Sequence, residues 1–93
     1  MSDSATEMNN AGSEITVPPT PDTVLDVKGL LCPLPVLKAR KSLSSMQSGQ
    51  ILQVDATDPA AVIDIPHFCH ETGHQLAAQD QQEDLFRFWI VHR

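Results

Sequence analysis

A cysteine stands directly before a proline in the segment GLLCPLPVLKARKSL, residues 29–43. Pro33 suits the first turn of a helix, because its missing N–H would have no partner there. The unpaired N–H groups and the dipole of that helix end favour a thiolate, which predicts a lowered pKa of Cys32. Pro35 removes a second N–H and stiffens the turn, so we expect a projecting thiol rather than a buried apolar one. Because the thiolate is the nucleophile, the segment predicts sulfur chemistry at Cys32.

The surroundings of this cysteine in the sequence narrow the chemistry. Cys32 has no partner at Cys-x-x-Cys spacing, and neither an acyl-transfer triad nor a Gly-rich phosphate loop is evident. One activated cysteine is enough to accept a sulfur atom and to give it away again. Three function classes stay open: a sulfur carrier, a thiol redox protein that pairs Cys32 with Cys69, and a non-catalytic protein-interaction module. Cys69 itself, beside Phe68, is typical of a small core residue.

Charged residues near the cysteine are further candidates. Lys38, Arg40 and Lys41 place half of the basic residues of the chain within four positions. They could dock an acidic partner or raise the potential near the thiolate, and they are equally typical of the solvated face of an amphipathic helix. Asp58, followed by Pro59, predicts the start of a second helix with the acid as its N-cap.

Three histidines surround the second cysteine. His67, His70 and His74 follow one another three and four residues apart, a spacing at which a helix could offer a metal site. Gly73 is expected to end that helix before His74. We therefore predict solvent-exposed histidines and no metal.

Composition limits the class of protein. The chain of 93 residues carries a net charge of −6, which argues against charge-driven binding to nucleic acid or to anionic membranes. We find no apolar run long enough for a transmembrane helix and no secretory signal. Two cysteines in such a chain indicate a reducing compartment, so a cytoplasmic location is expected.

The charge also divides the chain. Residues 1–22 hold four acids, no Lys or Arg, and three prolines near their end. Such a segment cannot bury enough apolar surface to offset the entropy of ordering, so we predict a disordered acidic tail over 1–22. Residues 23–93 then form one small domain.

The hydrophobic pattern of this domain predicts six elements. Alternation indicates strands over 23–28 and 51–57, with Leu25, Val27, Leu52, Val54 and Ala56 facing inward. Apolar residues at helical spacing, at Val36, Ala39, Leu43 and Met46, indicate a helix from Pro33 that Ser48-Gly49 ends.

The second half of the domain carries the other three elements. Pro66 is expected to break the helix that starts at Asp58, with Asp64 capping a second piece to about Thr72 and Gly73 as its C-cap. HQLAAQD and LFRFWIVH are two strands joined by a polar turn at 81–84.

This order predicts an α/β (α+β) fold, a two-layer sandwich in which two helices cover one face of a four-stranded mixed sheet. Phe86, Phe88 and Ile90 share the inward face of the last strand. Trp89 and Val91 would point to the face without helices, which could then serve as a partner surface.

At this level of detail the sequence resembles the TusA family of sulfur-carrier proteins, also called SirA-like. The resemblance covers residues 24–92 and lies in the Cys-Pro-x-Pro motif of GLLCPLPVLKARKSL, in the Asp58-Pro59 helix start and in the segment DIPHFC. It implies a sheet order of 1-2-4-3 with the fourth strand antiparallel to the others. It also implies a cytoplasmic carrier without a cofactor of its own.

In function, the resemblance implies that Cys32 accepts sulfane sulfur as a persulfide from a cysteine desulfurase and passes it to a downstream relay protein. Members that feed tRNA thiolation have Glu between the two prolines, where this chain has Leu34. Sulfur oxidation and the supply of molybdenum cofactor or selenium are therefore comparable pathways. Leu34 and the three basic residues after it, Lys38, Arg40 and Lys41, are the candidates for partner docking.

Overall fold

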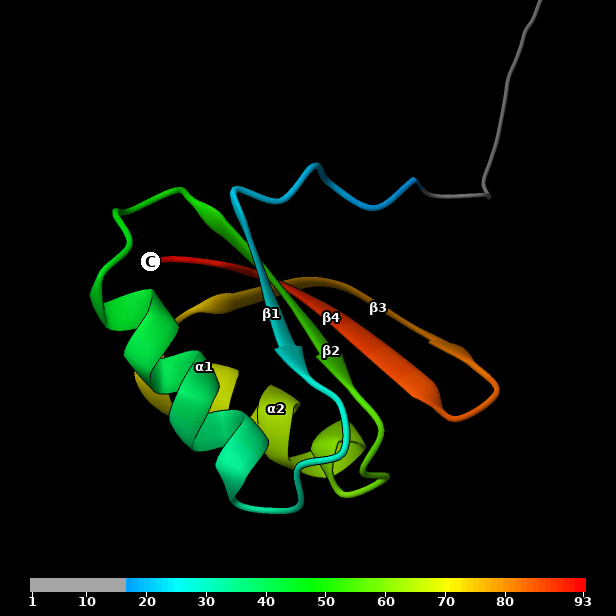
Figure 1. Ribbon diagram of the computed structural model, residues 1–93. Helices are drawn as coiled ribbons and strands as arrows, with labels where there is room; N and C mark the ends of the chain where they lie inside the picture. The colour runs from blue at the N-terminus through cyan, green and yellow to red at the C-terminus, as the bar shows by residue number, and fades with distance from the viewer. Residues whose placement is uncertain (1–16) are drawn as a thin grey trace, which may run out of the picture.

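A computed structural model of the protein describes residues 17–93. Its elements follow the order β1 (Thr23–Val27), α1 (Leu34–Ser44), β2 (Ile51–Ala56), α2 (Ala61–Thr72), β3 (Gln75–Gln82) and β4 (Leu85–Val91). Both helices lie side by side on one face of a single sheet (Figure 1). The predicted two-layer α+β sandwich is confirmed.

The four strands are arranged in the order β1-β2-β4-β3. β1 and β2 are parallel, and β4 runs antiparallel to both of its neighbours, β2 and β3. This is the order and the direction that the family resemblance implied. Because β1 and β2 are parallel neighbours, their carboxyl ends meet at one edge of the sheet, and both helices begin there.

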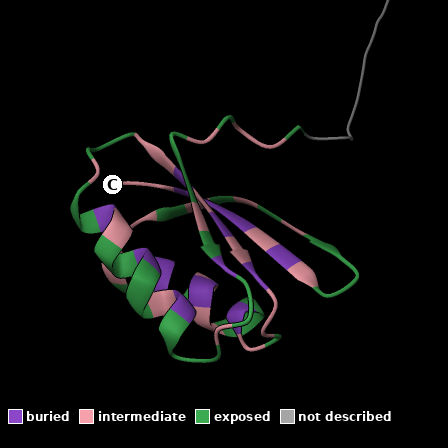
Figure 2. Ribbon diagram, in the orientation of Figure 1, coloured by how far each residue is buried: buried purple, intermediate pink, exposed green. Residues whose placement is uncertain are grey.

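The core lies between the sheet and the helices, and the period-two pattern of the strands builds it. Every second residue of β2 is buried, whereas β4 also has a run of consecutive buried residues and β3 has none, as the colours in Figure 2 show. The helices contribute a narrower set of side chains from their sheet-facing sides. The completely or almost completely buried side chains include Val27, Leu43, Leu52, Val54, Ile65, Phe88 and Ile90.

Helix α1 ends at Ser44, four residues before the predicted stop at Ser48-Gly49. Two serines at this end bond back to the helix: Ser44 Oγ donates to Lys41 O at 2.6 Å, and Ser45 Oγ donates to Ser42 O at 3.0 Å. Short hydroxyl side chains offer the backbone such an alternative to further helical bonds. The local competition explains why the sequence prediction was too long.

Helix α2 is continuous through Pro66, so the predicted break near Asp64 was wrong. A proline at that position lacks the N–H that would have bonded to the carbonyl oxygen of Val62. Val62 is 44% exposed, so water can solvate the carbonyl region that the proline leaves unpaired. Gly73 ends the helix as predicted, with a φ of 83° and its N–H donated to Cys69 O at 2.9 Å.

The sheet face without helices differs from the expectation of an exposed apolar surface. Trp89 is only 3% exposed there. Its ring nitrogen donates to Gln53 Oε1 at 3.1 Å, and the Arg87 guanidinium lies 5.3 Å from the ring centre. Asp80 holds Arg87 in place through two short bonds. Polar side chains therefore cover the tryptophan.

The segment before β1 is held to the sheet at Asp22, the residue that directly precedes the strand. Asp22 N donates to Ile51 O, and Asp22 Oδ2 accepts from Ile51 N, both at 2.8 Å. Residues 1–16 of the predicted tail lie outside the described residues. Within residues 17–93, no helix is both long and apolar enough to cross a membrane.

Candidate functional site

Cys32 lies in the connection between β1 and α1, and its side chain is exposed. Pro33 occupies the N-cap position of α1, and Pro35 lies in its first turn and is buried. The thiol therefore stands just outside the helix start, as the two prolines predicted. The loop that carries Cys32 follows β1, and the parallel pairing of β1 with β2 brings this loop next to the segment that follows β2.

Two hydrogen bonds join this loop to the segment that follows β2. Gly29 N donates to Thr57 Oγ1 at 2.9 Å, and Cys32 N donates to Asp58 Oδ2 at 2.7 Å. The other oxygen of Asp58 accepts from Ala60 N at 3.1 Å. Asp58 was predicted to be the N-cap of α2, but that position is Ala60. Its carboxylate instead links the turn before α2 to the backbone of the cysteine.

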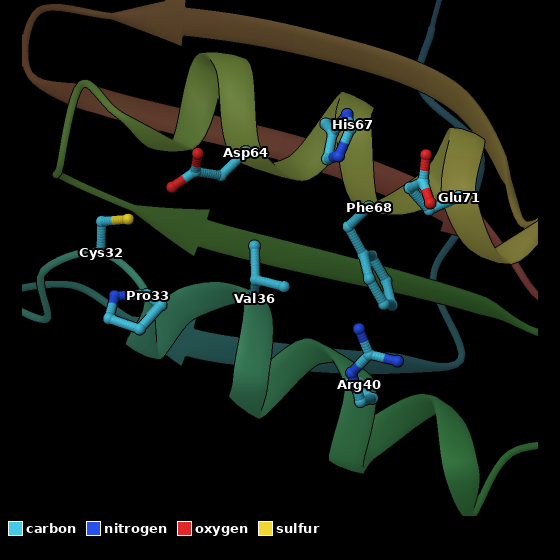
Figure 3. A pocket seen from close by; sticks show the side chains of 8 residues that line it. All are labelled: Cys32, Pro33, Val36, Arg40, Asp64, His67, Phe68 and Glu71. Carbon is cyan, nitrogen blue, oxygen red and sulfur yellow. The ribbon is translucent and has the colours of Figure 1, made fainter.

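An open groove of about 320 Å³ runs between the two helices and has Cys32 at one end. Figure 3 shows the Asp64 carboxylate from α2 facing the thiol at this end, with Arg40 and Glu71 at the other. The side chains that line the groove are Cys32, Pro33, Val36, Arg40, Asp64, His67, Phe68 and Glu71.

The charges at this end of the groove act on the ionisation of the thiol. A hydrogen bond to the Asp64 carboxylate is the main cause that raises the pKa of Cys32, followed by desolvation and by the negative charges of Asp64 and Asp58. The prediction of a lowered pKa was therefore wrong. It counted the helix start and the prolines, and it omitted two carboxylates that the fold brings from the start of α2.

The predicted docking residues do not form one cluster. Arg40 lines the groove, with its guanidinium 5.1 Å from the centre of the Phe68 ring. Lys38 and Lys41 line a separate hollow beside β1. Leu34 is 44% exposed in the first turn of α1. Of the three predicted basic docking residues, Arg40 therefore shares a hollow with the thiol, and Lys38 and Lys41 line another.

Two exposed apolar side chains, next to Cys32 and Asp64 in the chain, were missed by the sequence analysis. Leu31 immediately precedes Cys32 and is 67% exposed, while Ile63 immediately precedes Asp64 and is 74% exposed. Each lies beside a helix start rather than on a regular apolar face. Such positions look like loop or helix-end residues in the sequence, so the hydrophobic period gives no signal for them.

Cys69 occupies a different environment from Cys32. It is free and buried in the core, 3% exposed, and desolvation raises its pKa to about 11. The prediction of a small core residue is confirmed. A thiol that is both buried and kept protonated is poorly suited to exchange with Cys32.

Of the three histidines predicted to be exposed, His67 and His70 are exposed, but His74 is half-buried, so the prediction was wrong for His74. His67 lines the groove, whereas His74 packs against Phe68 and against the ring of His92. Burial, together with the nearby charges of His92 and Arg93, lowers the pKa of His74. Across residues 17–93, His, Cys, Asp and Glu side chains form no group of three that could hold a metal ion.

Comparison with known proteins gives matches that cover most of this domain. The family model described as sulfurtransferase TusA matches residues 23–91. The sulfur carrier protein TusA of Allochromatium vinosum is 46% identical over 69 residues, which are 74% of this chain and 91% of that protein. TusA of Pseudomonas putida strain GB-1 is 44% identical over 71 residues, 76% of this chain and 89% of the relative.

Among solved structures, the fold is similar to that of a SirA-like protein from Desulfitobacterium hafniense. The TM-score is 0.66 at 21% sequence identity, and the match covers 74% of this chain and 95% of the other. At this identity the likeness is one of fold.

Proposed function

The chain belongs to the TusA family of sulfur carriers, and on that premise we propose that it carries sulfane sulfur as a persulfide on Cys32. The observation that carries the proposal is the exposed thiol at the end of an open groove, next to a helix start. A donor protein can reach such a thiol, and an acceptor can reach the sulfur that it holds. Cys69, buried in the core, is not the carrier.

The transfer exchanges one sulfur–sulfur bond for another. Cys32 Sγ bonds to the outer sulfur of a persulfide on the donor, and the sulfur–sulfur bond of the donor breaks. The electron pair of that bond stays on the donor cysteine, which also takes up the proton of Cys32. The donor cysteine returns to a thiol while Cys32 becomes a persulfide, so no further oxidant is needed.

The donor that we propose is a cysteine desulfurase, and the acceptor is a downstream relay protein. Leu34 and Arg40 are the proposed docking residues nearest to the thiol, with Lys38 and Lys41 on the neighbouring surface of α1. The pathways that such a carrier would serve are tRNA thiolation, sulfur oxidation, or the supply of molybdenum cofactor or selenium. We propose a cytoplasmic location for it.

The test is the intact mass of the protein after incubation with a cysteine desulfurase and cysteine. We expect a gain of about 32 Da for each sulfur atom, reversed by a reductant. Cys32→Ser should abolish the gain, and Cys69→Ser should retain it. A persulfide found only on Cys69 would overturn the assignment of the site.

A further inference from the structure

The Cys32 thiol is exposed, yet its nearest charged neighbours are both acidic. Asp58 Oδ2 accepts the Cys32 N–H at 2.7 Å, and Asp64 faces the thiol from α2 (Figure 3). Two negative charges beside a sulfur disfavour a third one, so they oppose formation of the thiolate. The thiolate is the reactive form of a carrier cysteine, and these two charges keep Cys32 in the protonated, unreactive form.

The remaining charges around the groove do not offset this arrangement. Arg40 of α1 stands at the other end, where it packs against Phe68 and lies opposite Glu71 of α2 (Figure 3). His67 of α2 lines the groove between Asp64 and Glu71 (Figure 3). Asp64, desolvation and Asp58 all raise the pKa of Cys32.

We propose that Asp64 restrains the Cys32 thiol in the free carrier, and that a protein partner releases it by placing a cationic side chain against Asp64. This inference rests on the proposed function, and it adds the chemistry that a donor or acceptor must bring to the site. A partner without a cation at this position would meet a protonated thiol.

The surroundings of the two groups suit such a partner. Leu31 and Ile63, which precede Cys32 and Asp64 in the chain and are both exposed, offer apolar surface that a docked protein can cover. Covering it removes water from the site, and an ion pair with Asp64 gains strength when water is excluded. The partner cation then cancels the charge that opposed the thiolate, so Cys32 becomes nucleophilic only within the complex.

Small disulfides of opposite charge test the proposal directly. Cystamine carries two ammonium groups, and 3,3′-dithiodipropionate carries two carboxylates. In each reaction the Cys32 thiolate attacks a disulfide sulfur, a mixed disulfide forms, and half of the reagent leaves as a thiolate. The rates are measured by mass spectrometry of the Cys32 peptide at neutral pH, for the wild type and its variants.

We expect the wild type to react severalfold faster with cystamine than with 3,3′-dithiodipropionate. Asp64→Asn should reduce this preference severalfold. It should also speed the reaction with neutral iodoacetamide and move its pH midpoint downward. Asp64→Glu, which keeps the charge, should retain the preference for the cationic reagent.

Glu71→Gln is the matched control, because it removes one negative charge from the same helix and the same groove but at the far end from Cys32. It should leave the reagent preference close to that of the wild type. Circular dichroism of each variant checks that the fold is retained.

An unchanged preference in Asp64→Asn, or an equal loss in Glu71→Gln, would overturn the proposal. These reagents require no persulfide, so this result is independent of the mass experiment that tests the carrier function.

Discussion

At the scale of the residue, the two cysteines are opposites in exposure. Cys32 lies at the surface with Asp64 opposite (Figure 3), and Cys69 is one of the buried residues of α2. Both thiols have a raised pKa, but for different reasons: at Cys32 the main cause is a carboxylate, and at Cys69 it is desolvation. Access, rather than ionisation alone, therefore separates the proposed carrier thiol from the buried one.

This contrast predicts the order of alkylation in the native protein. At pH 8, iodoacetamide should modify Cys32 well before Cys69, because only Cys32 is exposed and the pKa of Cys69 is about 11. The rate at Cys32 should keep rising with pH above 8, since its raised pKa leaves most of the thiol protonated there. Peptide mapping of a time course measures both sites. Equal rates in the native state would contradict the placement of the two thiols, and equal rates in denaturant are the expected control.

At the scale of the element, the site depends on how each helix begins and ends. The turn before α2 supplies Asp58 to the Cys32 N–H, the first turn of α2 supplies Asp64 to the thiol, and Gly73 at its end turns the chain toward β3. A φ of 83° at Gly73 is in the left-handed region that glycine adopts without a steric penalty. The backbone conformation at the end of α2 therefore favours glycine at position 73, for a reason unrelated to the site around Cys32.

Gly73→Ala should lower the free energy of unfolding by about 1 kcal/mol, because a side chain is strained at this backbone conformation. The added Cβ would also lie 3.4 Å from Cδ of Arg93, which is a flexible side chain and can move aside. Urea unfolding measures the loss. Gly73→Asn should lose less, since asparagine tolerates this conformation better than alanine does.

A Gly73→Ala variant as stable as the wild type would show that this helix end relaxes to another conformation. The rate of sulfur acceptance at Cys32 should be unchanged in both variants, because the substitution lies at the opposite end of α2 from Asp64.

At the scale of the whole molecule, the domain and the acidic segment before it meet at Asp22. Its two hydrogen bonds with Ile51 extend the pairing of β1 and β2 by one residue.

Deletion of residues 1–20 should leave the free energy of unfolding unchanged, because the hydrogen bonds between Asp22 and Ile51 remain. Adding Asp22→Ala should remove the side-chain bond and cost about 1 kcal/mol. Thermal or urea unfolding distinguishes the two, and a large loss from the deletion alone would show that the preceding segment is structural.

The acidic segment should also affect sulfur transfer through charge. Residues 1–20 carry three acids and no base, and they can compete for the basic residues of α1. We expect the deletion to leave acceptance by Cys32 unchanged or slightly faster, with a difference that shrinks as salt is raised. Persulfide transfer rates across ionic strength measure this effect. Loss of transfer at every salt concentration would instead mean that the segment recruits the donor.

The sequence by itself determined the fold and the position of Cys32, the proposed carrier thiol. Strand alternation fixed which face of β2 is buried, and the Cys-Pro-x-Pro segment placed Cys32 outside a helix start. Both are local properties, since each depends on residues a few positions apart. The breaks and ends of the helices were less predictable, because Pro66 is accommodated by an exposed turn and the serines after α1 compete for its last carbonyls.

Only the tertiary structure decided the electrostatics of the site. Asp58 lies 26 residues from Cys32 in the chain, and it reaches the cysteine N–H because β1 and β2 are parallel neighbours. Asp64 reaches the thiol because α2 packs beside α1. Charge interactions depend on distance in space, so the helix start alone gave the wrong sign for the pKa shift of Cys32. The fold placed two acids where the sequence had indicated only a helix dipole.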